Sequence, residues 1–401
     1  MREWWRERLA VRPWWMNGLM LFCAFMAALY MPWDFFVKPV AHDAEAWFGF
    51  LLRGWGAKLT EPLHWAIYAA GAYGFWRMRA WMWPWAALYA AQVALGMFVW
   101  NVVYVGGLHG WLGGSVSFVP FALLTMALWG AREQFGRRRP SMRQRYGEWA
   151  LITGASAGIG DVFARALARD GMSCVLTARR DDRLRALASE LEQQYHVATR
   201  VVAADLADPG GPERLLEAIQ DLPIDVFVNN AGFGYAGRFD KQETARLRDM
   251  VQVNCVAPVV LASRLLPAMR ARGRGAMIVS GSIAGRQPLP RHALYSATKV
   301  FDLHFGEALW AELRGTGVDV LVIEPGATES EFRDVAGETR AVGVPAADVV
   351  ALAFEALGQQ PSVIYGWFNW LRANFIRVAP RTGATLLAEQ VILEQTPLAM
   401  R

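Results

Sequence analysis

The octet Thr153 to Gly160, Thr-Gly-Ala-Ser-Ala-Gly-Ile-Gly, constrains the fold of this chain more than any other segment. An apolar, strand-like run from Trp149 to Ile152 precedes it, and a helix-like stretch from Asp161 to Arg169 follows it. A glycine turn between a strand and a helix presents backbone N–H groups at the helix N-terminus, where a pyrophosphate binds. The octet therefore predicts a nucleotide-binding strand, turn and helix.

Strand-like and helix-like stretches alternate from this octet onward. Helix-like stretches of ten or more residues separate the strand-like ones, a pattern typical of a parallel sheet covered by helices on both faces. We therefore predict an α/β fold with a Rossmann-type, doubly wound parallel sheet. Six runs are predicted as its strands: 150–153, 174–177, 200–203, 226–228, 277–280 and 318–323.

The first 149 residues have apolar runs longer than a soluble core element needs, and they hold 16 of the 19 tryptophans. A membrane span needs about 20 mostly apolar residues, and we predict spans at 13–37, 80–105 and 116–131. A shorter stretch, 62–76, crosses if the bilayer thins locally or Arg77 reaches the headgroups. Residues 1–135 are thus predicted as an all-α transmembrane domain of four helices, and the first run is too long for a cleaved secretory signal.

Arginines predict the orientation of these spans, because cytoplasmic loops carry an excess of basic residues. The predicted loop Gly106 to Gly114 has none, so both ends of the membrane domain are predicted to be cytoplasmic. The net charge of +5 indicates attraction to anionic headgroups, and no nucleic-acid recognition motif is present. The arginines that flank the spans are Arg2, Arg6, Arg8, Arg12, Arg77, Arg79, Arg132, Arg137, Arg138, Arg139, Arg143 and Arg145.

Domain boundaries follow from the change in composition. Residues 136–147 form a basic linker, 148–335 a dinucleotide-binding catalytic domain and 336–401 a helical, amphipathic extension. Within that extension, Val363 to Val378 interleaves aromatic residues with arginines. Such a segment covers a substrate pocket, contacts the membrane surface or packs on the core, and the sequence leaves all three open.

The second motif is Tyr295-Ser-Ala-Thr-Lys299, which begins 135 residues after Gly160. On a helix, residues four apart lie on one face, so a phenol and an ammonium are predicted to be neighbours. Other polar or glycine-containing segments follow the predicted strands, at the sheet edge where α/β proteins bind ligands. They are Asp205-Leu206, Asn229-Asn230-Ala231-Gly232, Ser282 and Pro325-Gly326, with Asn254 in a following helix.

These motifs together resemble the short-chain dehydrogenase/reductase family over about residues 148 to 333. The resemblance implies a catalytic tetrad of Asn254, Ser282, Tyr295 and Lys299, with Ser282 chosen over Ser280 because it stands thirteen residues before Tyr295 and precedes Ile-Ala-Gly. Gly281 stands where the family commonly has serine. The cofactor-binding residues it implies are Gly154, Ser156, Gly158, Ile159, Gly160, Arg179, Asp205, Leu206, Asn230, Tyr295, Lys299, Pro325 and Thr328.

The expected chemistry is hydride transfer to a carbonyl carbon, which leaves negative charge on the oxygen that a proton donor must meet. The pKa of a free tyrosine is about 10, and bringing it near neutrality requires roughly 4 kcal/mol of differential stabilisation of the phenolate. The ammonium of Lys299 and an oxidised nicotinamide supply that field. The resemblance implies that Ser282 hydrogen-bonds the carbonyl oxygen and that Asn254 holds a water linked to Lys299.

Ala178-Arg179-Arg180 predicts the cofactor. An acidic residue at the end of the second strand would bind the ribose hydroxyls of NAD(H), whereas arginine accommodates the 2′-phosphate of NADP(H). The first acid is Asp181, so NADP(H) is predicted, with Arg179 as the clamp and an arginine pair that only caps the next helix as the alternative.

No metal site is predicted. His42, His64 and His109 would lie on the outer side of the membrane, but no pair has the close spacing of metal ligands. Likewise Cys23, Cys174 and Cys255 are scattered, as expected for reduced thiols.

The sequence thus predicts a multi-pass membrane oxidoreductase with a cytoplasmic, NADPH-dependent catalytic domain. Its predicted partners are membrane lipids and an apolar carbonyl substrate, such as a 3-oxoacyl or sphingoid-type ketone; no nucleic acid is expected, and homo-oligomerisation is left open. The alternative is a cofactor-binding redox sensor or scaffold attached to a membrane domain that carries the main function. A transport function of the spans is disfavoured because they contain few ionisable groups.

Overall fold

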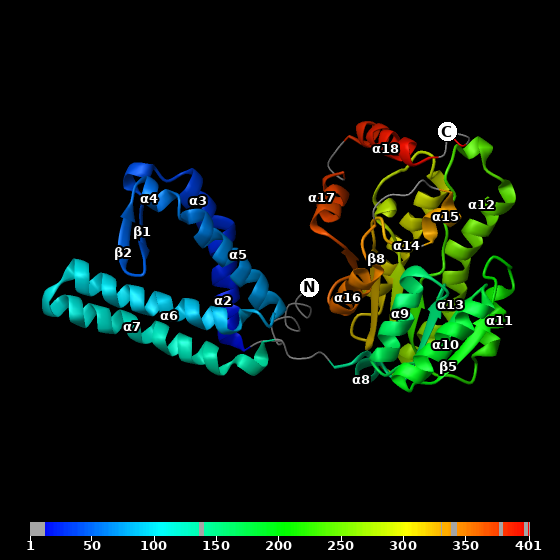
Figure 1. Ribbon diagram of the computed structural model, residues 1–401, viewed down its shortest axis with the longest axis horizontal. Helices are drawn as coiled ribbons and strands as arrows, with labels where there is room; N and C mark the ends of the chain where they lie inside the picture. The colour runs from blue at the N-terminus through cyan, green and yellow to red at the C-terminus, as the bar shows by residue number, and fades with distance from the viewer. Residues whose placement is uncertain are drawn as a thin grey trace. The chain divides into compact units, whose positions relative to one another are not determined.

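The computed structural model describes residues 13–135, 140–329, 331–337, 343–376, 380–396 and 400. The chain divides into two compact units, Met1–Arg139 and Pro140–Arg401 (Figure 1). The arginines predicted before the first span and Arg137 to Arg139 of the predicted linker lie outside the described residues.

The first unit consists mainly of apolar helices. Helix α2 (Trp14–Phe25) continues through a π-helical turn into α3 (Met31–Phe36), and α6 (Met82–Trp100) continues through a second such turn. Helices α5 (Glu61–Arg77) and α7 (Gly107–Gly130) complete the set. Many large apolar side chains on these helices are exposed, as expected where the outer face of a helix contacts lipid.

Three helical segments of this unit are long and apolar enough to cross a membrane: Trp14–Phe36, Met82–Val105 and Gly107–Gly130, each with a mean hydropathy of 1.6. Among the described residues one further segment, Thr244–Ala271, meets the same criterion, but it belongs to the second unit, where helix α13 packs against the sheet. The predicted second span corresponds to α5, which at 17 residues is shorter than these.

Helix α7 corrects the prediction for the fourth span. The sequence predicted a loop from Gly106 to Gly114 and a span from residue 116, but the helix begins at Gly107. A Cβ atom at Gly110 would lie 2.7 Å from the carbonyl oxygen of Asn101, and one at Gly114 would lie 3.1 Å from Phe98. These glycines let two helices approach closely, as small residues do inside membranes, so they mark a helix contact here and not a turn.

The segment between α3 and α5 contains an antiparallel hairpin, β1 (Ala44–Trp47) and β2 (Phe50–Arg53), and the short helix α4 (Trp55–Lys58). The prediction of a purely helical first domain did not include this hairpin. His64 hydrogen-bonds Glu45 at 2.9 Å and stacks on the Trp47 ring at 4.0 Å, so this histidine is packed within the protein.

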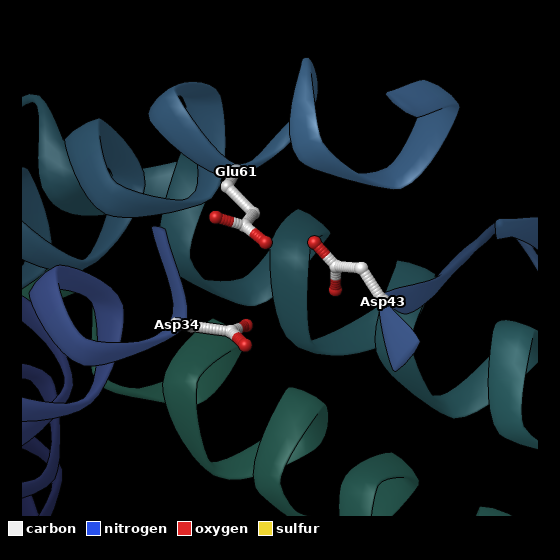
Figure 2. Close-up of side chains that lie close together, drawn as sticks. All are labelled: Asp34, Asp43 and Glu61. Carbon is white, nitrogen blue, oxygen red and sulfur yellow. The ribbon is translucent and has the colours of Figure 1, made fainter. Parts of the chain in front are cut away.

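A buried charge network ties this hairpin to the helices. The carboxylates of Asp34, Asp43 and Glu61 converge (Figure 2), and two ammonium groups lie among them. Lys38 Nζ is 2.8 Å from Asp34 and 2.7 Å from Asp43, while Lys58 Nζ is 3.3 Å from Asp43 and 3.4 Å from Glu61. The lysines offset most of the buried negative charge, which would otherwise be costly to bury.

The second unit is built on a parallel sheet of seven strands in the order β5-β4-β3-β6-β7-β8-β9. Its central strands are buried on both faces, which explains their continuous apolar sequence. This confirms the predicted doubly wound α/β fold. The strands are β3 (Trp149–Thr153), β4 (Ser173–Ala178), β5 (Thr199–Ala203), β6 (Ile224–Asn229), β7 (Gly275–Ser280), β8 (Val318–Glu324) and β9 (Ser362–Ile364).

Helices cover both faces of the sheet through two apolar cores. One core is formed with α9 (Gly158–Arg169), α10 (Asp181–Tyr195) and α16 (Ala346–Ala356). The other is formed with a helix that precedes β6 and with the helices on either side of β7 in the chain. These are α11 (Gly211–Ala218), α13 (Ala257–Ala271) and α14 (Ala293–Glu312), while α12 (Thr244–Val251) leads into α13 through a π-helical turn.

Two predicted boundaries of the catalytic domain differ from the structure. Strand β9 pairs with β8 and so extends the sheet beyond residue 335. At the other end, helix α8 (Met142–Tyr146) lies in the predicted linker, yet Arg145 pairs with Asp319 at 2.6 Å and Tyr146 is buried. Both segments therefore belong to the second unit, and Arg145 is not a headgroup-facing arginine.

Three more helices complete this unit: α15 (Phe332–Ala336), α17 (Trp367–Phe375) and α18 (Arg381–Gln395). The predicted amphipathic segment from Val363 contains the end of β9 and then α17. Most of its aromatic side chains are exposed, whereas Ala373 is buried.

Candidate active site

The glycine turn between β3 and α9 forms one side of a cavity. Gly154 and Gly158 have φ angles of +68° and +60°, which favour glycine. A Cβ atom at Gly160 would lie 2.3 Å from the carbonyl oxygen of Gly154, so a larger residue there would push the turn away from the helix. Glycine at these three positions therefore allows the tight turn between β3 and α9. The first residue of α9, Gly158, lines the cavity.

Asn230 fixes the neighbouring strand ends. Its backbone N–H donates to Thr153 Oγ1 at 2.9 Å, and its side-chain amide donates to the Thr153 carbonyl at 3.1 Å. Ser280 donates its hydroxyl to Asn230 Oδ1 at 3.1 Å. Asn230 therefore links β3, β6 and β7 where all three reach the cavity.

The cavity has a volume of about 980 Å³, within the range of small-molecule and cofactor sites. The structure brings most of the predicted site residues together around it, while Gly160 and Asn254 lie behind its wall. The predicted residues that line it are Gly154, Ser156, Gly158, Ile159, Arg179, Asp205, Leu206, Asn230, Ser282, Tyr295, Lys299, Pro325 and Thr328.

Tyr295 and Lys299 lie on the same face of α14, as their spacing predicted, with Lys299 Nζ 5.9 Å from the centre of the Tyr295 ring. Ser282 follows β7, and its hydroxyl accepts a hydrogen bond from Ala284 N–H at 3.1 Å. The hydroxyl of Ser280 donates to Asn230 Oδ1 at 3.1 Å, whereas that of Ser282 donates to the Pro325 carbonyl only at 3.4 Å. The weaker contact of Ser282 makes it the better suited of the two serines for contact with a carbonyl oxygen. The three groups are thus arranged as an acid, a cation and a hydrogen-bonding hydroxyl.

Asp302 is a further member of this site that the sequence analysis missed. Lys299 Nζ donates to its carboxylate at 2.8 Å and to the Ser280 carbonyl at 2.7 Å, and both Lys299 and Asp302 are buried. Burial disfavours the charged lysine, but the nearby Asp302 carboxylate outweighs this effect and raises the pKa of Lys299. The i,i+3 spacing on one helix could have revealed the pair.

Asn254 lies in the π-helical turn Gln252–Val256 that joins α12 to α13, and it is buried. Its amide group donates to the Phe233 carbonyl and to Thr298 Oγ1, each at 3.0 Å, and its oxygen accepts from Phe233 N–H at 3.1 Å. Asn254 therefore joins the loop after β6 to the helix of Tyr295 and Lys299. Its holding of a water stays a prediction.

The arginines after β4 differ in their contacts. Arg180 donates to Ser156 Oγ at 3.0 and 3.2 Å, so it is fixed to the glycine turn. Arg179, the predicted clamp, is exposed at the cavity edge. Asp205, one of the predicted cofactor-binding residues, is also exposed, and its carboxylate accepts a hydrogen bond from Ala207 N–H at 3.0 Å.

Helices α17 and α18 line one part of the cavity. The side chains that they contribute are mostly apolar, which suits a hydrocarbon ligand better than a sugar. They are Arg372, Ala373, Ile376, Ala384, Leu387, Ala388, Val391 and Ile392.

His292 gives the site a predictable dependence on pH. It is 3% exposed, its ring centre lies 6.0 Å from that of Tyr295, and burial lowers its pKa to about 4. In the unfolded chain the His292 imidazole is protonated with a pKa near 6.5, whereas in the folded protein it stays neutral until about pH 4. The free energy of unfolding therefore falls as the pH decreases from 6.5 toward 4. Between pH 6.5 and 5 we expect a loss of up to about 2 kcal/mol.

The free energy of unfolding of the wild type and of His292→Gln at these two pH values tests this expectation. The glutamine variant should lack this part of the pH dependence. Equal pH dependence in the two proteins would contradict it.

Comparison with known proteins adds the family context. The family model for short chain dehydrogenases matches residues 148–341. A 7beta-hydroxysteroid dehydrogenase of Collinsella aerofaciens is 34% identical over 236 residues, which cover 57% of this chain and 90% of that protein. A very-long-chain 3-oxoacyl-CoA reductase of Homo sapiens is 31% identical over 225 residues, 54% of this chain and 70% of that protein.

Two solved structures are similar to the chain. A structure from a study of 7beta-hydroxysteroid dehydrogenase stereoselectivity superposes with a TM-score of 0.58 at 30% identity, covering 62% of this chain and 99% of that one. A short-chain dehydrogenase from Sphingobium yanoikuyae in complex with NADPH gives a TM-score of 0.54 at 31% identity, covering 59% and 94%.

Proposed function

The chain belongs to the short-chain dehydrogenase/reductase family of oxidoreductases that act on hydroxyl and keto groups, and from this premise we propose that it is a membrane-anchored NADPH-dependent reductase of an apolar, lipid-like ketone or aldehyde. The observation that carries the proposal is the cavity in which Tyr295, Lys299 and Ser282 meet an apolar wall from α17 and α18. The names of the relatives, which refer to hydroxysteroids and very-long-chain 3-oxoacyl-CoA, support this substrate class.

The cofactor side of the cavity fits a phosphorylated dinucleotide. Gly154 and Gly158 have backbone conformations that favour glycine, and a Cβ atom at Gly160 would clash with the Gly154 carbonyl. Together with the N-terminus of α9, this tight glycine turn suits a pyrophosphate. Arg180, 20 residues beyond Gly160, suits a 2′-phosphate. The solved structure of a similar short-chain dehydrogenase in complex with NADPH supports NADPH over NADH as the cofactor.

The residues of this chain perform the proton chemistry in the proposed reaction. When NADPH is bound, its nicotinamide supplies the hydride. Ser282 hydrogen-bonds the carbonyl oxygen, and Tyr295 donates its phenolic proton to that oxygen as negative charge forms there. Lys299 stabilises the resulting phenolate through its ammonium. Asp302 and the Ser280 carbonyl hold the ammonium in place.

The proposed membrane attachment rests on the first unit. Its long apolar helices carry exposed tryptophan, phenylalanine and leucine side chains, which are stable against lipid and costly in water. With the arginine distribution of the sequence, this supports a multi-pass protein whose catalytic unit is cytoplasmic. The intact arrangement of Tyr295 and Lys299 favours turnover over the alternative of a redox sensor or scaffold.

The direct test is NADPH oxidation by the purified full-length protein in lipid nanodiscs, with 3-oxo compounds of increasing chain length. Each methylene buried against α17 and α18 should contribute about 0.8 kcal/mol, or roughly fourfold in kcat/KM, until the apolar part is filled. Oxidation of NADPH that does not depend on a carbonyl compound, or is insensitive to chain length, would contradict the proposal.

Cofactor choice gives a separate prediction. Arg180→Ser should weaken NADPH binding roughly 10- to 100-fold, because a charge-assisted hydrogen bond to phosphate contributes about 1.5–3 kcal/mol, and should leave NADH binding nearly unchanged. Arg179→Ser is the matched control and should have a smaller effect, because Arg180 is the arginine that is held at the glycine turn through Ser156. Fluorescence titration with NADPH and with NADH measures the two affinities. A larger loss of NADPH affinity in Arg179→Ser than in Arg180→Ser would assign the clamp to Arg179.

A further inference from the structure

A single carboxylate bridges two arginines at the cavity edge. Arg180 Nη1 is 2.6 Å from Glu331 Oε2, and Arg183 Nη1 is 2.6 Å from Glu331 Oε1. Arg180 directly precedes α10 and Arg183 lies within it, whereas Glu331 directly precedes α15. Both Arg180 and Glu331 line the cavity. The bridge therefore joins the cofactor side of the site to the segment after β8.

The position of the bridge is where a 2′-phosphate would bind. In a doubly wound fold, the residue about 20 positions beyond the glycine turn meets the adenosine ribose, and arginine there accommodates a phosphate. The Glu331 carboxylate places two anionic oxygens against these guanidinium groups, as a phosphate would. The arginine contacts hold the pKa of Glu331 below its usual range.

The ion pairs of Glu331 with the two arginines are weak enough for another anion to replace the carboxylate. The side chains of Arg180 and Glu331 are 41% and 43% exposed, and an exposed ion pair contributes at most about 1 kcal/mol. A phosphate group carries a charge of roughly −1.5 to −2 at neutral pH and has three acceptor oxygens. It would therefore displace a singly charged carboxylate from the two arginines.

Glu331 is also joined directly to a residue that contacts the catalytic tyrosine. The ring centre of Phe332 lies 5.4 Å from that of Tyr295. Phe332 packs closely on the loop after β6 as well, because a Cβ atom at Gly234 would lie 3.1 Å from its ring. Movement of Glu331 away from the arginines would thus alter the packing against the Tyr295 ring.

We propose that Glu331 occupies the 2′-phosphate subsite of the cofactor-free protein, and that the phosphate of NADPH displaces it and releases Phe332 from Tyr295. Glu331 is then a specificity-determining residue, since NADH has no group to replace it. This inference rests on the proposed function, because it requires NADPH to bind. It extends that function by coupling the choice of cofactor to access for the carbonyl substrate.

The test compares Glu331→Gln with Glu243→Gln in the full-length protein in nanodiscs. Glu243 is an exposed carboxylate that lines the same cavity without being part of the arginine bridge, so its variant controls for loss of one negative charge. We expect Glu331→Gln to lower the Kd for NADPH about three- to tenfold, with the Kd for NADH unchanged and Glu243→Gln close to wild type.

Hydrogen exchange of residues 331–337 is the second readout. NADPH but not NADH should increase exchange there in the wild type, whereas Glu331→Gln should show increased exchange without cofactor. An unchanged ratio of NADPH to NADH affinity in Glu331→Gln, or weaker NADPH binding, would overturn the inference while leaving the proposed function intact. Failure of the wild type to bind NADPH would overturn both.

Discussion

Replacement of Tyr295 by phenylalanine is expected to lower kcat for carbonyl reduction by about 10³-fold or more, with little change in the Kd for NADPH. The phenolic hydroxyl is the proposed proton donor, and loss of a positioned general acid costs roughly 10² to 10⁴ in rate. Phenylalanine retains the ring that packs between His292 and Phe332, so the fold and the cofactor side of the cavity should be preserved. Steady-state kinetics and cofactor titration of the same sample measure the two effects.

Tyr365→Phe is a suitable control for this experiment. It removes a tyrosine hydroxyl that donates to Asp348 at 2.9 Å, and Tyr365 does not line the cavity. Activity of Tyr295→Phe within tenfold of the wild type would assign the proton donor to another group. Membrane-linked function that persisted unchanged in this variant would favour the sensor or scaffold alternative.

Replacement of Lys299 by methionine is expected to remove activity and stability together. The phenolate of Tyr295 loses its cation, so kcat should fall by a factor comparable to that of Tyr295→Phe. In addition, Asp302 is left as a buried charge without its partner, and loss of one partner of a buried ion pair costs about 3–5 kcal/mol. Denaturation monitored by tryptophan fluorescence, together with kinetics, measures both losses.

The double variant Lys299→Met with Asp302→Asn separates these two effects. An uncharged asparagine does not need the ammonium, so the double variant should recover most of the stability while remaining inactive. Recovery of activity in the double variant would show that Lys299 only supports the fold. No recovery of stability would show that Asp302 is not the source of the loss.

The sheet was predicted from sequence because its central strands are buried on both faces and appear as continuous apolar runs, such as that from Val226 to Val228. Strand β9 was missed because it is only three residues long and each of its residues is half-buried. Its place in the sheet depends on pairing with β8, more than 35 residues earlier in the chain. Such a contact leaves no local pattern.

The first unit shows where glycine misleads a prediction. The predicted loop from Gly106 to Gly114 includes Gly110 and Gly114, and glycine destabilises helices in water. In the structure they allow α7 to contact α6 closely, and that packing decides the local conformation. In the charge network, Asp34–Lys38 and Lys58–Glu61 have helical i,i+4 and i,i+3 spacings. The contacts of both lysines with Asp43 have no such spacing, so the sequence does not show that the two pairs form one network.

The site was predicted better than its supporting contacts. Tyr295 and Lys299 could be placed on one face because the helical period fixes their relation. The sequence does not show which of the adjacent Arg179 and Arg180 faces the glycine turn. The contact of Arg180 with Ser156 is the reason that we propose Arg180 as the clamp, while the role of Arg179 stays a prediction. Glu331 could not be foreseen, because its partners lie about 150 residues earlier in the chain.

Transfer of deuterium from NADPH that carries deuterium at both C4 positions of the nicotinamide shows whether the cofactor delivers its hydride to a carbonyl carbon in this site. The full-length protein in nanodiscs is given a long-chain 3-oxo compound, and the product is analysed by mass spectrometry. We expect one deuterium on the carbinol carbon of the new alcohol, and no product from Tyr295→Phe on the same timescale. An alcohol without deuterium, or NADPH consumption without an alcohol, would contradict it.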